Sequence, residues 1–333
     1  MQNRGQSDGR QTDSAISLIR CISMLMIVTC HFFQYYGNEL AYWFNGGVYI
    51  FFAISGFLYG SKVIDDPIKF LSRKFKSVLI PYYTFLVPAI ALYFFFARSS
   101  FSVGSVVKAL VCSGTIDGLG HLWFVAYILF CYFITPYLYW FGKKCEGYSF
   151  LRFTCISIAL LIAIQVIGYM FDSFFRADRI TCYIIGYLFS VYSKRYGKKV
   201  TVGICVLFAV SGVAVNIVRI YIKYLSGMQL SGVFAKVFIF AEPYAHLLLF
   251  SAMFMVLYLI ASKVKYNVLL KLSDRYSYEV YLVHRLFILS PFSLMAITPF
   301  KYLNWVLVVV AIALLAIILK FVTEKTIKPK KVK

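Results

Sequence analysis

Long apolar stretches recur along almost the whole chain, and they constrain its fold more than any other feature. A helix needs about 20 mostly apolar residues to cross a membrane. Ten stretches reach or approach that length, at residues 16–37, 43–62, 77–97, 121–142, 150–171, 180–193, 200–220, 241–261, 277–296 and 302–322. We therefore predict an all-α fold, a polytopic membrane helix bundle of about ten transmembrane helices.

The composition supports this prediction and excludes other classes of protein. The 333 residues are 61% hydrophobic and 14% charged, whereas a soluble domain is about 25% charged. A globular fold of this length could not enclose so much apolar surface. Disordered, collagen-like and disulfide-rich secreted chains are excluded as well. The eight cysteines lie mostly inside apolar stretches and form no CxxC motif, so we expect neither a metal site nor a structural disulfide.

The net charge of +21 is distributed in short clusters between the apolar stretches. This pattern argues against nucleic acid as a partner, although a basic chain often binds it. With ten spans, the basic clusters fall on one side, which the positive-inside rule makes cytoplasmic. We thus predict a multi-pass protein of the plasma or inner membrane with both termini cytoplasmic. It would comprise a cytoplasmic leader (1–15), a membrane domain (16–322) and a basic cytoplasmic tail (323–333).

Ionisable side chains within the predicted spans are functional candidates, because burying them in a membrane is costly. Arg20 and His31 share the first span, and eleven residues place them within about 20° of one helix face and about 16 Å apart along the axis. Both have ordinary alternatives. An arginine at a helix start can snorkel to the membrane surface, and His31 can hydrogen-bond to a neighbouring helix.

By predicted depth, the polar residues of the spans and their cytoplasmic ends divide into two groups. The inner, basic group suits an anionic ligand that carries phosphate, although its members can also be membrane anchors. It contains Arg20, Arg73, Lys74, Lys76, His284 and Arg285. The outer group suits proton transfer near neutral pH. It contains His31, His121, Glu242 and His246. An activated anionic donor on the inner side and a hydroxyl acceptor on the outer side is one chemistry that this division would serve.

Five short motifs occur in order between about residues 14 and 290. They are Arg20-x10-His31, FFxxSGFL at 51–58, a basic stretch ending Leu79-Ile80-Pro81-Tyr82, His121-Leu122-Trp123-Phe124, and Ser277-Tyr278-x-x-Tyr281-Leu282-x-His284. The Ser-Gly pair of the second motif also permits close helix packing. Together the motifs resemble the acyltransferase-3 family of integral-membrane acyltransferases, in a stand-alone membrane form. The basic stretch has fewer arginines than is usual in that family.

The resemblance implies transfer of an acyl group, usually acetyl from cytoplasmic acetyl-CoA, to a hydroxyl of a cell-surface or exported polysaccharide. It implies that His31 is the catalytic histidine, as general base or covalent carrier, and that Arg20 is its partner on the donor side. The donor phosphates would contact Arg20, Arg73, Lys74, Lys76 and Arg285. We expect the acceptor near His121, Trp123, Glu242 and His246.

Two other classes of function stay open at this point. A flippase or transporter of a glycan or lipid-linked sugar would also line its path with buried charges, although no inverted repeat with broken helices is evident. A membrane scaffold or sensor is the third reading. The ordered motifs favour the enzyme. Its expected partners are acyl-CoA, a glycan acceptor and membrane lipids, and a homo-oligomer stays open.

Overall fold

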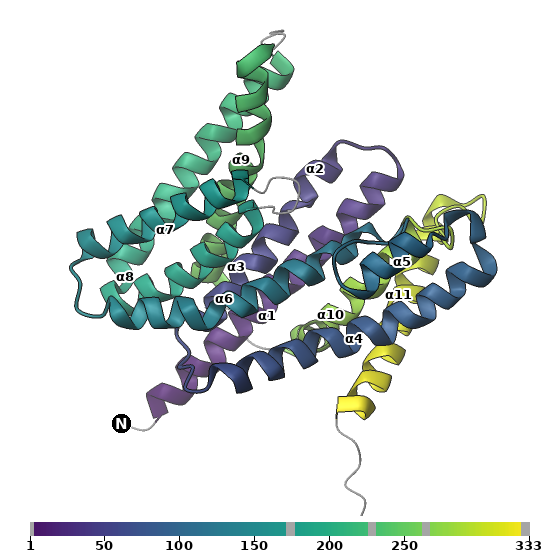
Figure 1. The fold of residues 1–333 in the computed structure, drawn as a ribbon, viewed down its shortest axis with the longest axis horizontal. Coiled ribbons are helices and arrows are strands. Elements are labelled where there is room, and N and C mark those ends of the chain that lie inside the picture. Colours follow the sequence, from purple (N-terminus) through teal and green to yellow (C-terminus); the bar gives the residue numbers. More distant parts are fainter. Residues whose placement is uncertain (1–2, 171–176, 226–230, 262–266, 328–333) are drawn as a thin grey trace, which may run out of the picture. The chain divides into compact units, whose positions relative to one another are not determined.

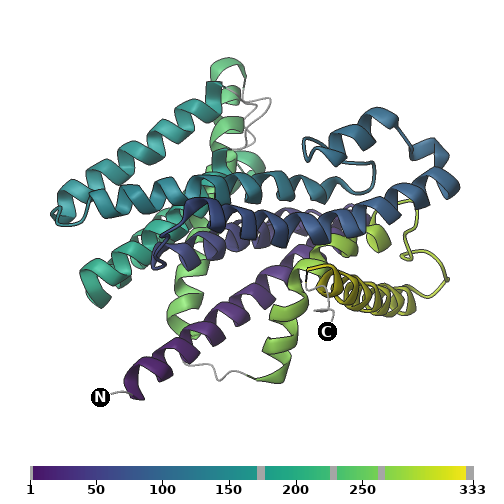
Figure 2. The ribbon, with the colours of Figure 1, turned by 60° about the horizontal axis from the view of Figure 1, so that its bottom comes forward.

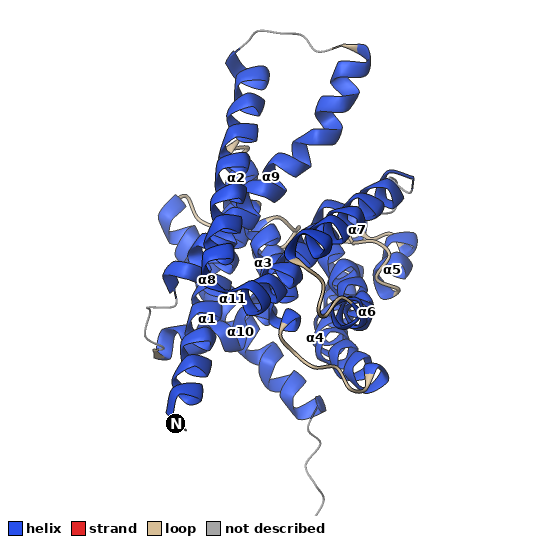
Figure 3. Ribbon diagram, turned by 90° about the vertical axis from the view of Figure 1, so that its left-hand side faces the viewer, coloured by secondary structure: helices blue, strands red, loops and turns tan. Residues whose placement is uncertain are grey.

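The computed structural model describes residues 3–170, 177–225, 231–261 and 267–327 (Figure 1). In these ranges every regular element is a helix, and loops connect them (Figure 3). The α-helices are α1 (Asn3–Tyr35), α2 (Leu40–Phe44), α3 (Gly46–Gly60), α4 (Pro67–Phe96), α5 (Val103–Leu110), α6 (Trp123–Lys144), α7 (Phe150–Met170), α8 (Ala177–Ile220), α9 (Gly232–Ala261), α10 (Val268–Ile288) and α11 (Lys301–Ile327). Three short helical segments accompany them, η1 (Arg98–Ser100), η2 (Gly120–Leu122) and η3 (Tyr221–Leu225).

Eight of the described helices are long and apolar enough to cross a membrane, which confirms the prediction of a polytopic helical membrane protein. The count is lower than ten partly because α8 is a single element that covers the two predicted spans 180–193 and 200–220. Its backbone leaves the helical region at Gly197, where φ is 77° and ψ is −174°. A positive φ favours glycine, so α8 bends between the two predicted spans.

The helix α10 is the other difference from the expected count. It is not among the eight apolar helices, and it carries Lys271, Asp274, Arg275, Glu279 and Arg285. It also begins at Val268 and ends at Ile288, whereas the hydropathy predicts a span at 277–296. The predicted boundaries were therefore wrong by about eight residues at both ends.

The segments predicted as leader and tail continue the terminal helices. Residues 3–13 form the first turns of α1, which Figure 2 shows as one uninterrupted helix, and the part of α1 suited to cross a membrane is Ser14–Tyr35. At the other end, α11 continues to Ile327, so it includes part of the predicted tail, and residues 328–333 lie outside the described residues. The side of the membrane on which the termini lie stays a prediction.

The chain forms two compact units, which we describe separately. The first contains residues 3–23, 45–64 and the described part of 135–270. Its core includes a close crossing of α3 and α8, at which glycines allow backbone to meet backbone. A Cβ atom added to Gly56 would clash with the carbonyl oxygen of Tyr183, and one added to Gly186 would clash with that of Ala53. This confirms that the small residues of the second motif permit close helix packing.

The second unit contains residues 24–44, 65–134 and the described part of 271–333. Here α10 is tied to α11 by an ion pair between Lys320 Nζ and the buried Glu279 Oε1, 3.1 Å apart. It is tied to α4 by the Tyr278 hydroxyl, which donates to the carbonyl oxygen of Val78 at 3.0 Å. These contacts fix the position of α10, the helix that carries His284.

Candidate active site

Three histidines from distant parts of the sequence come together in the second unit. His31 lies near the end of α1, His121 in η2, and His284 near the end of α10. The rings of His31 and His284 are stacked with their centroids 4.9 Å apart. The His121 ring meets the edge of His284 at 4.8 Å and lies 6.4 Å from His31. His121 and His284 are buried, with 3% and 0% of their surface exposed.

Hydrogen bonds fix which nitrogen of each imidazole carries a proton. A neutral imidazole has one N–H donor and one nitrogen with a lone pair, and a nitrogen that faces an oxygen acceptor must be the donor. The donors are His31 Nδ1 to Gln34 Oε1 at 2.6 Å, His121 Nε2 to the Leu282 carbonyl at 3.0 Å, and His284 Nδ1 to the Tyr281 carbonyl at 2.7 Å. The other nitrogen of each ring is therefore a base.

Two of these basic nitrogens have no hydrogen-bond partner among the described residues. They are His121 Nδ1 and His284 Nε2, and both are buried. Because a buried polar atom without a partner is costly, such atoms are often kept for a functional reason.

A tight turn before η2 holds His121 in place. Gly118 adopts φ 74°, and a Cβ atom there would lie 2.7 Å from the Cα atom of Ser290 and 2.9 Å from the Tyr93 hydroxyl. The same hydroxyl donates to the carbonyl oxygen of Asp117 at 2.7 Å. The Tyr281 hydroxyl donates to the carbonyl oxygen of His121 itself. The backbone on either side of the imidazole is thus fixed by buried tyrosines.

Arg285 lies beside the histidines. One of its terminal nitrogens is 2.6 Å from the position that a Cβ atom on Gly120 would take, so the glycine leaves room for the guanidinium next to His121. Its Nε atom is buried and has no hydrogen-bond partner among the described residues. The site therefore combines imidazole bases with a cation that has an unused donor.

The predicted separation of His284 and Arg285 from His31 and His121 was wrong. That prediction placed His284 in the cytoplasmic half of a span at 277–296. Because α10 runs from Val268 to Ile288, His284 lies four residues from the end of the helix instead of near its start. With the observed boundaries, His284 and Arg285 lie near the C-terminal end of α10, next to η2.

The other predicted donor-site residues of the second unit lie on α4. Arg73 and Lys76 are exposed, and Lys74 is half-buried with its ammonium 5.8 Å from the centre of the Tyr132 ring. Trp123, a predicted acceptor residue, begins α6 two residues after His121 and meets Tyr127 edge to face at 5.4 Å. Nothing in these contacts tests the predicted roles.

The remaining candidates belong to the first unit, so their position relative to the three histidines is not described. Glu242 on α9 is held by Arg219 at 3.1 Å and by Lys223 at 3.2 Å. His246 is buried one turn later, with its ring edge to face on Phe250 at 5.3 Å. Arg20 is half-buried in α1. Their roles stay predictions.

Two residues of the site had no predicted role, Gln34, which the sequence reasoning missed, and Tyr281, which it named only as part of the fifth motif. Gln34 orients His31 from one helical turn away, and an i, i+3 spacing on a helix could have indicated it. Tyr281 precedes His284 by three residues and so shares its face, but its bond to the His121 backbone joins segments 160 residues apart. No local pattern indicates such a contact.

The fold and the site define a polytopic membrane protein with a buried cluster of imidazole bases, a site suited to proton transfer. A family model described as an acyltransferase domain, Acyl_transf_3, matches residues 13–325. Since the match covers nearly the whole chain, the chain belongs to this family of acyltransferases, which confirms the resemblance of the five motifs. No curated protein and no solved structure matches the chain.

Proposed function

We propose that this membrane acyltransferase moves an acetyl group from cytoplasmic acetyl-CoA to a hydroxyl of a cell-surface or exported polysaccharide. The observation that carries the proposal is the cluster of His31, His121 and His284, in which each ring has one nitrogen committed as a donor and the other available as a base. Acyl transfer to a hydroxyl needs such a base, because a neutral hydroxyl is a weak nucleophile.

In the first route, His31 Nε2 takes the proton of the acceptor hydroxyl while the hydroxyl oxygen attacks the thioester carbonyl. The carbon–sulfur bond then breaks, and the CoA thiolate leaves with the proton from the imidazolium. The products are the acetyl ester and free CoA. In the second route, His31 Nε2 attacks the thioester first, the carbon–sulfur bond breaks, and CoA leaves as its thiolate. The acceptor hydroxyl then attacks the acetyl-imidazolium, its proton goes to the CoA thiolate, and neutral His31 is restored. Both routes consume one acetyl-CoA for each ester.

The tetrahedral intermediate of either route carries a negative oxygen that needs a hydrogen-bond donor. Arg285 is the proposed donor, because its buried Nε atom has no partner among the described residues and its guanidinium lies beside Gly120. This role replaces the phosphate contact that the sequence indicated for Arg285. The phosphates of CoA are assigned to Arg73, Lys74 and Lys76 of the second unit, and Arg20 of the first unit keeps its predicted role as a donor-side residue.

The acceptor polysaccharide is assigned to His121 and Trp123, which flank Leu122 where η2 ends and α6 begins. Glu242 and His246 of the first unit are kept as separate candidates for acceptor contacts, and within that unit Arg219 orients the Glu242 carboxylate. Hydroxyl-rich ligands suit such a set of hydrogen-bonding and aromatic side chains.

The test uses the purified full chain in nanodiscs. Release of free CoA from acetyl-CoA is followed with and without candidate polysaccharides, and CoA binding is followed by thermal shift. Release that depends on an acceptor would support the proposal. A folded protein that binds no CoA would contradict it and favour a flippase. A covalent acetyl group on His31, found by mass spectrometry after a rapid quench without acceptor, would select the second route.

A further inference from the structure

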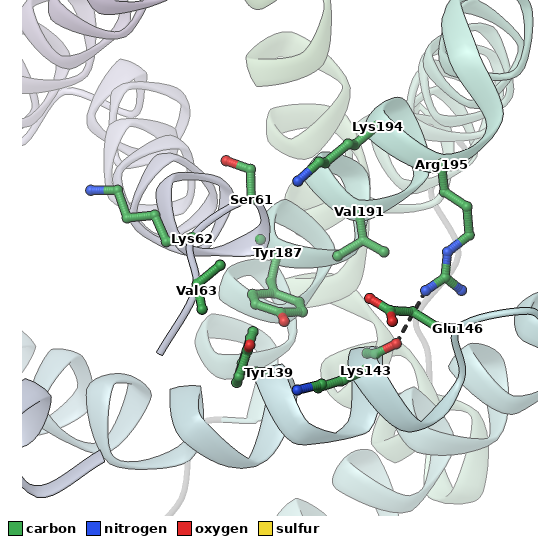
Figure 4. A pocket seen from close by; sticks show the side chains of 12 residues that line it. Ser61, Lys62, Val63, Tyr139, Lys143, Glu146, Tyr187, Val191, Lys194 and Arg195 are labelled. Carbon is green, nitrogen blue, oxygen red and sulfur yellow. Dashed lines mark hydrogen bonds between the residues drawn. The ribbon is translucent and has the colours of Figure 1, made fainter. Parts of the chain in front are cut away.

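A cavity of about 350 Å³ in the first unit shares no residue with the site described above (Figure 4). It lies where α3 and α6 end and just before α8 bends at Gly197. Residues 60–63 form one wall, the segment from Tyr139 to Glu146 forms another, and Tyr187 to Arg195 of α8 form the third. Its volume is within the range of about 300–1,000 Å³ that is typical of small-molecule sites.

The charge of this cavity is strongly one-sided. Four cationic side chains line it, Lys62, Lys143, Lys194 and Arg195, against the single carboxylate of Glu146. In the view of Figure 4 the rings of Tyr139 and Tyr187 lie between Lys143 and Lys194. Tyrosine hydroxyls and ammonium groups are donors to phosphate oxygens. Cations that only anchor a helix in a membrane spread into the headgroup region, whereas Lys143, Lys194 and Arg195 line one cavity.

One of the cations is fixed in place before any ligand arrives. Arg195 Nη1 donates to the carbonyl oxygen of Cys145 at 3.0 Å, and Nη2 donates to that of Gly142 at 3.1 Å. The guanidinium also lies 4.5 Å from the centre of the Phe153 ring. These neutral carbonyl oxygens orient the guanidinium without neutralising its charge. The wall of the cavity therefore keeps a fixed positive charge, which reduces the entropic cost of binding an anion.

We propose that this cavity binds the phosphate group of an anionic ligand, supplied either by a soluble nucleotide or by a phospholipid headgroup. Lys143, Lys194 and the fixed Arg195 hold the phosphate, and Tyr139 and Tyr187 contact the group attached to it. The basic clusters predict that this end of the helices is cytoplasmic, a side on which nucleotides and anionic lipids are both present. The inference does not depend on the acyl-transfer proposal.

The experiment compares variants of the full chain in nanodiscs. Lys143→Gln and Lys194→Gln, singly and together, remove cavity cations. Lys198→Gln and Lys199→Gln are the matched control, because these exposed lysines lie on the same helix outside the cavity. ADP and inorganic pyrophosphate are the soluble probes in phosphatidylcholine nanodiscs, and nanodiscs with added phosphatidylglycerol are the lipid probe. Protection of Lys143 and Lys194 from chemical acetylation is measured on the wild type, so the result does not depend on a variant that folds.

The expected result is protection of both lysines by one source of phosphate. Each cavity variant should weaken the binding of the probe that protects the lysines about tenfold or more, as expected for loss of a charged hydrogen bond. The control variants should leave the affinity for that probe unchanged. Glu146→Gln should strengthen binding, because it removes the only carboxylate of the cavity. Protection by ADP or pyrophosphate identifies a nucleotide site, and protection by phosphatidylglycerol alone identifies a headgroup site. Absence of protection by any probe, or equal effects in cavity and control variants, would overturn the proposal.

Discussion

Replacing Gly118 by alanine should displace the turn that holds His121, and the structure gives the magnitude. A residue with a Cβ atom at positive φ costs about 1–2 kcal/mol, and Gly118 has φ 74°. The new Cβ atom would also lie 2.7 Å from the Ser290 backbone and 2.9 Å from the Tyr93 hydroxyl. Relief of that contact would break the bond from Tyr93 to Asp117, worth about 0.5–1.5 kcal/mol. The total loss of stability should be about 2–3 kcal/mol.

Two other glycines separate the contributions to this loss. Gly147 has φ 85° with nothing within 4 Å of an added Cβ atom, so Gly147→Ala should pay only the backbone cost of about 1–2 kcal/mol. Gly203 lies inside α8 with open space around it. There, alanine should stabilise by about 0.5–1 kcal/mol, because glycine is a poor helix former.

The assay is heat unfolding of the three variants and the wild type in one detergent at one protein concentration. A change of 1 kcal/mol shifts the midpoint of a domain of 150–250 residues by about 2–4 °C. Gly118→Ala should therefore lower the midpoint by at least about 4 °C, Gly147→Ala by less, and Gly203→Ala should raise it. Equal midpoints for Gly118→Ala and Gly147→Ala would refute the reasoning, because Gly118 would then not be packed against Ser290 and Tyr93.

Three further predictions concern the second unit, to which Gly118 also belongs. Lys320→Met alone leaves the buried carboxylate of Glu279 unpaired and should cost about 3–5 kcal/mol, whereas adding Glu279→Gln should restore most of the heat stability; equal loss in both variants would contradict the pairing. Tyr281→Phe removes the donor to the His121 carbonyl and should cost about 1–3 kcal/mol and lower kcat more than it raises KM, so a change in KM alone would disagree. Burial raises the pKa of the Cys112 thiol, so fewer molecules carry the reactive thiolate at pH 7. Alkylation of a variant with Cys112 as the only cysteine should be slow at pH 7 and still accelerate above about pH 10, where an ordinary thiol is almost fully ionised; a rate that levels off by about pH 10 would indicate an unperturbed thiol.

Hydropathy was sufficient to predict the class of fold but not every helix boundary. It identifies where apolar residues lie, and α6 and α7 begin and end within two residues of the predicted spans. It failed at α10, where the helix begins at Val268 and includes Lys271, Asp274 and Arg275. Charged residues form helices readily, so a helix can start well before its apolar part does.

The candidate site was predicted only in part, because the predicted depth of a side chain depends on the predicted helix boundaries. His31 and His121 were recognised because polar side chains at membrane depth are costly. His284 was noticed but assigned to the wrong depth, since its depth was counted from a boundary that the helix does not have. The contact of Tyr281 with the His121 backbone depends on tertiary packing alone. The division of the chain into two units also joins segments far apart in sequence, which hydropathy does not register.

The measurement that tests the central claim most directly is the release of CoA from acetyl-CoA by the wild type, His31→Ala and Lys198→Gln in nanodiscs, with an acceptor that supports turnover. The account predicts that His31→Ala loses at least about a hundredfold in kcat, the usual range for a lost general base, while it still binds CoA and unfolds at the wild-type temperature. Lys198→Gln should retain full activity. A folded His31→Ala variant with wild-type turnover would contradict the assignment of the three-histidine cluster as the active site.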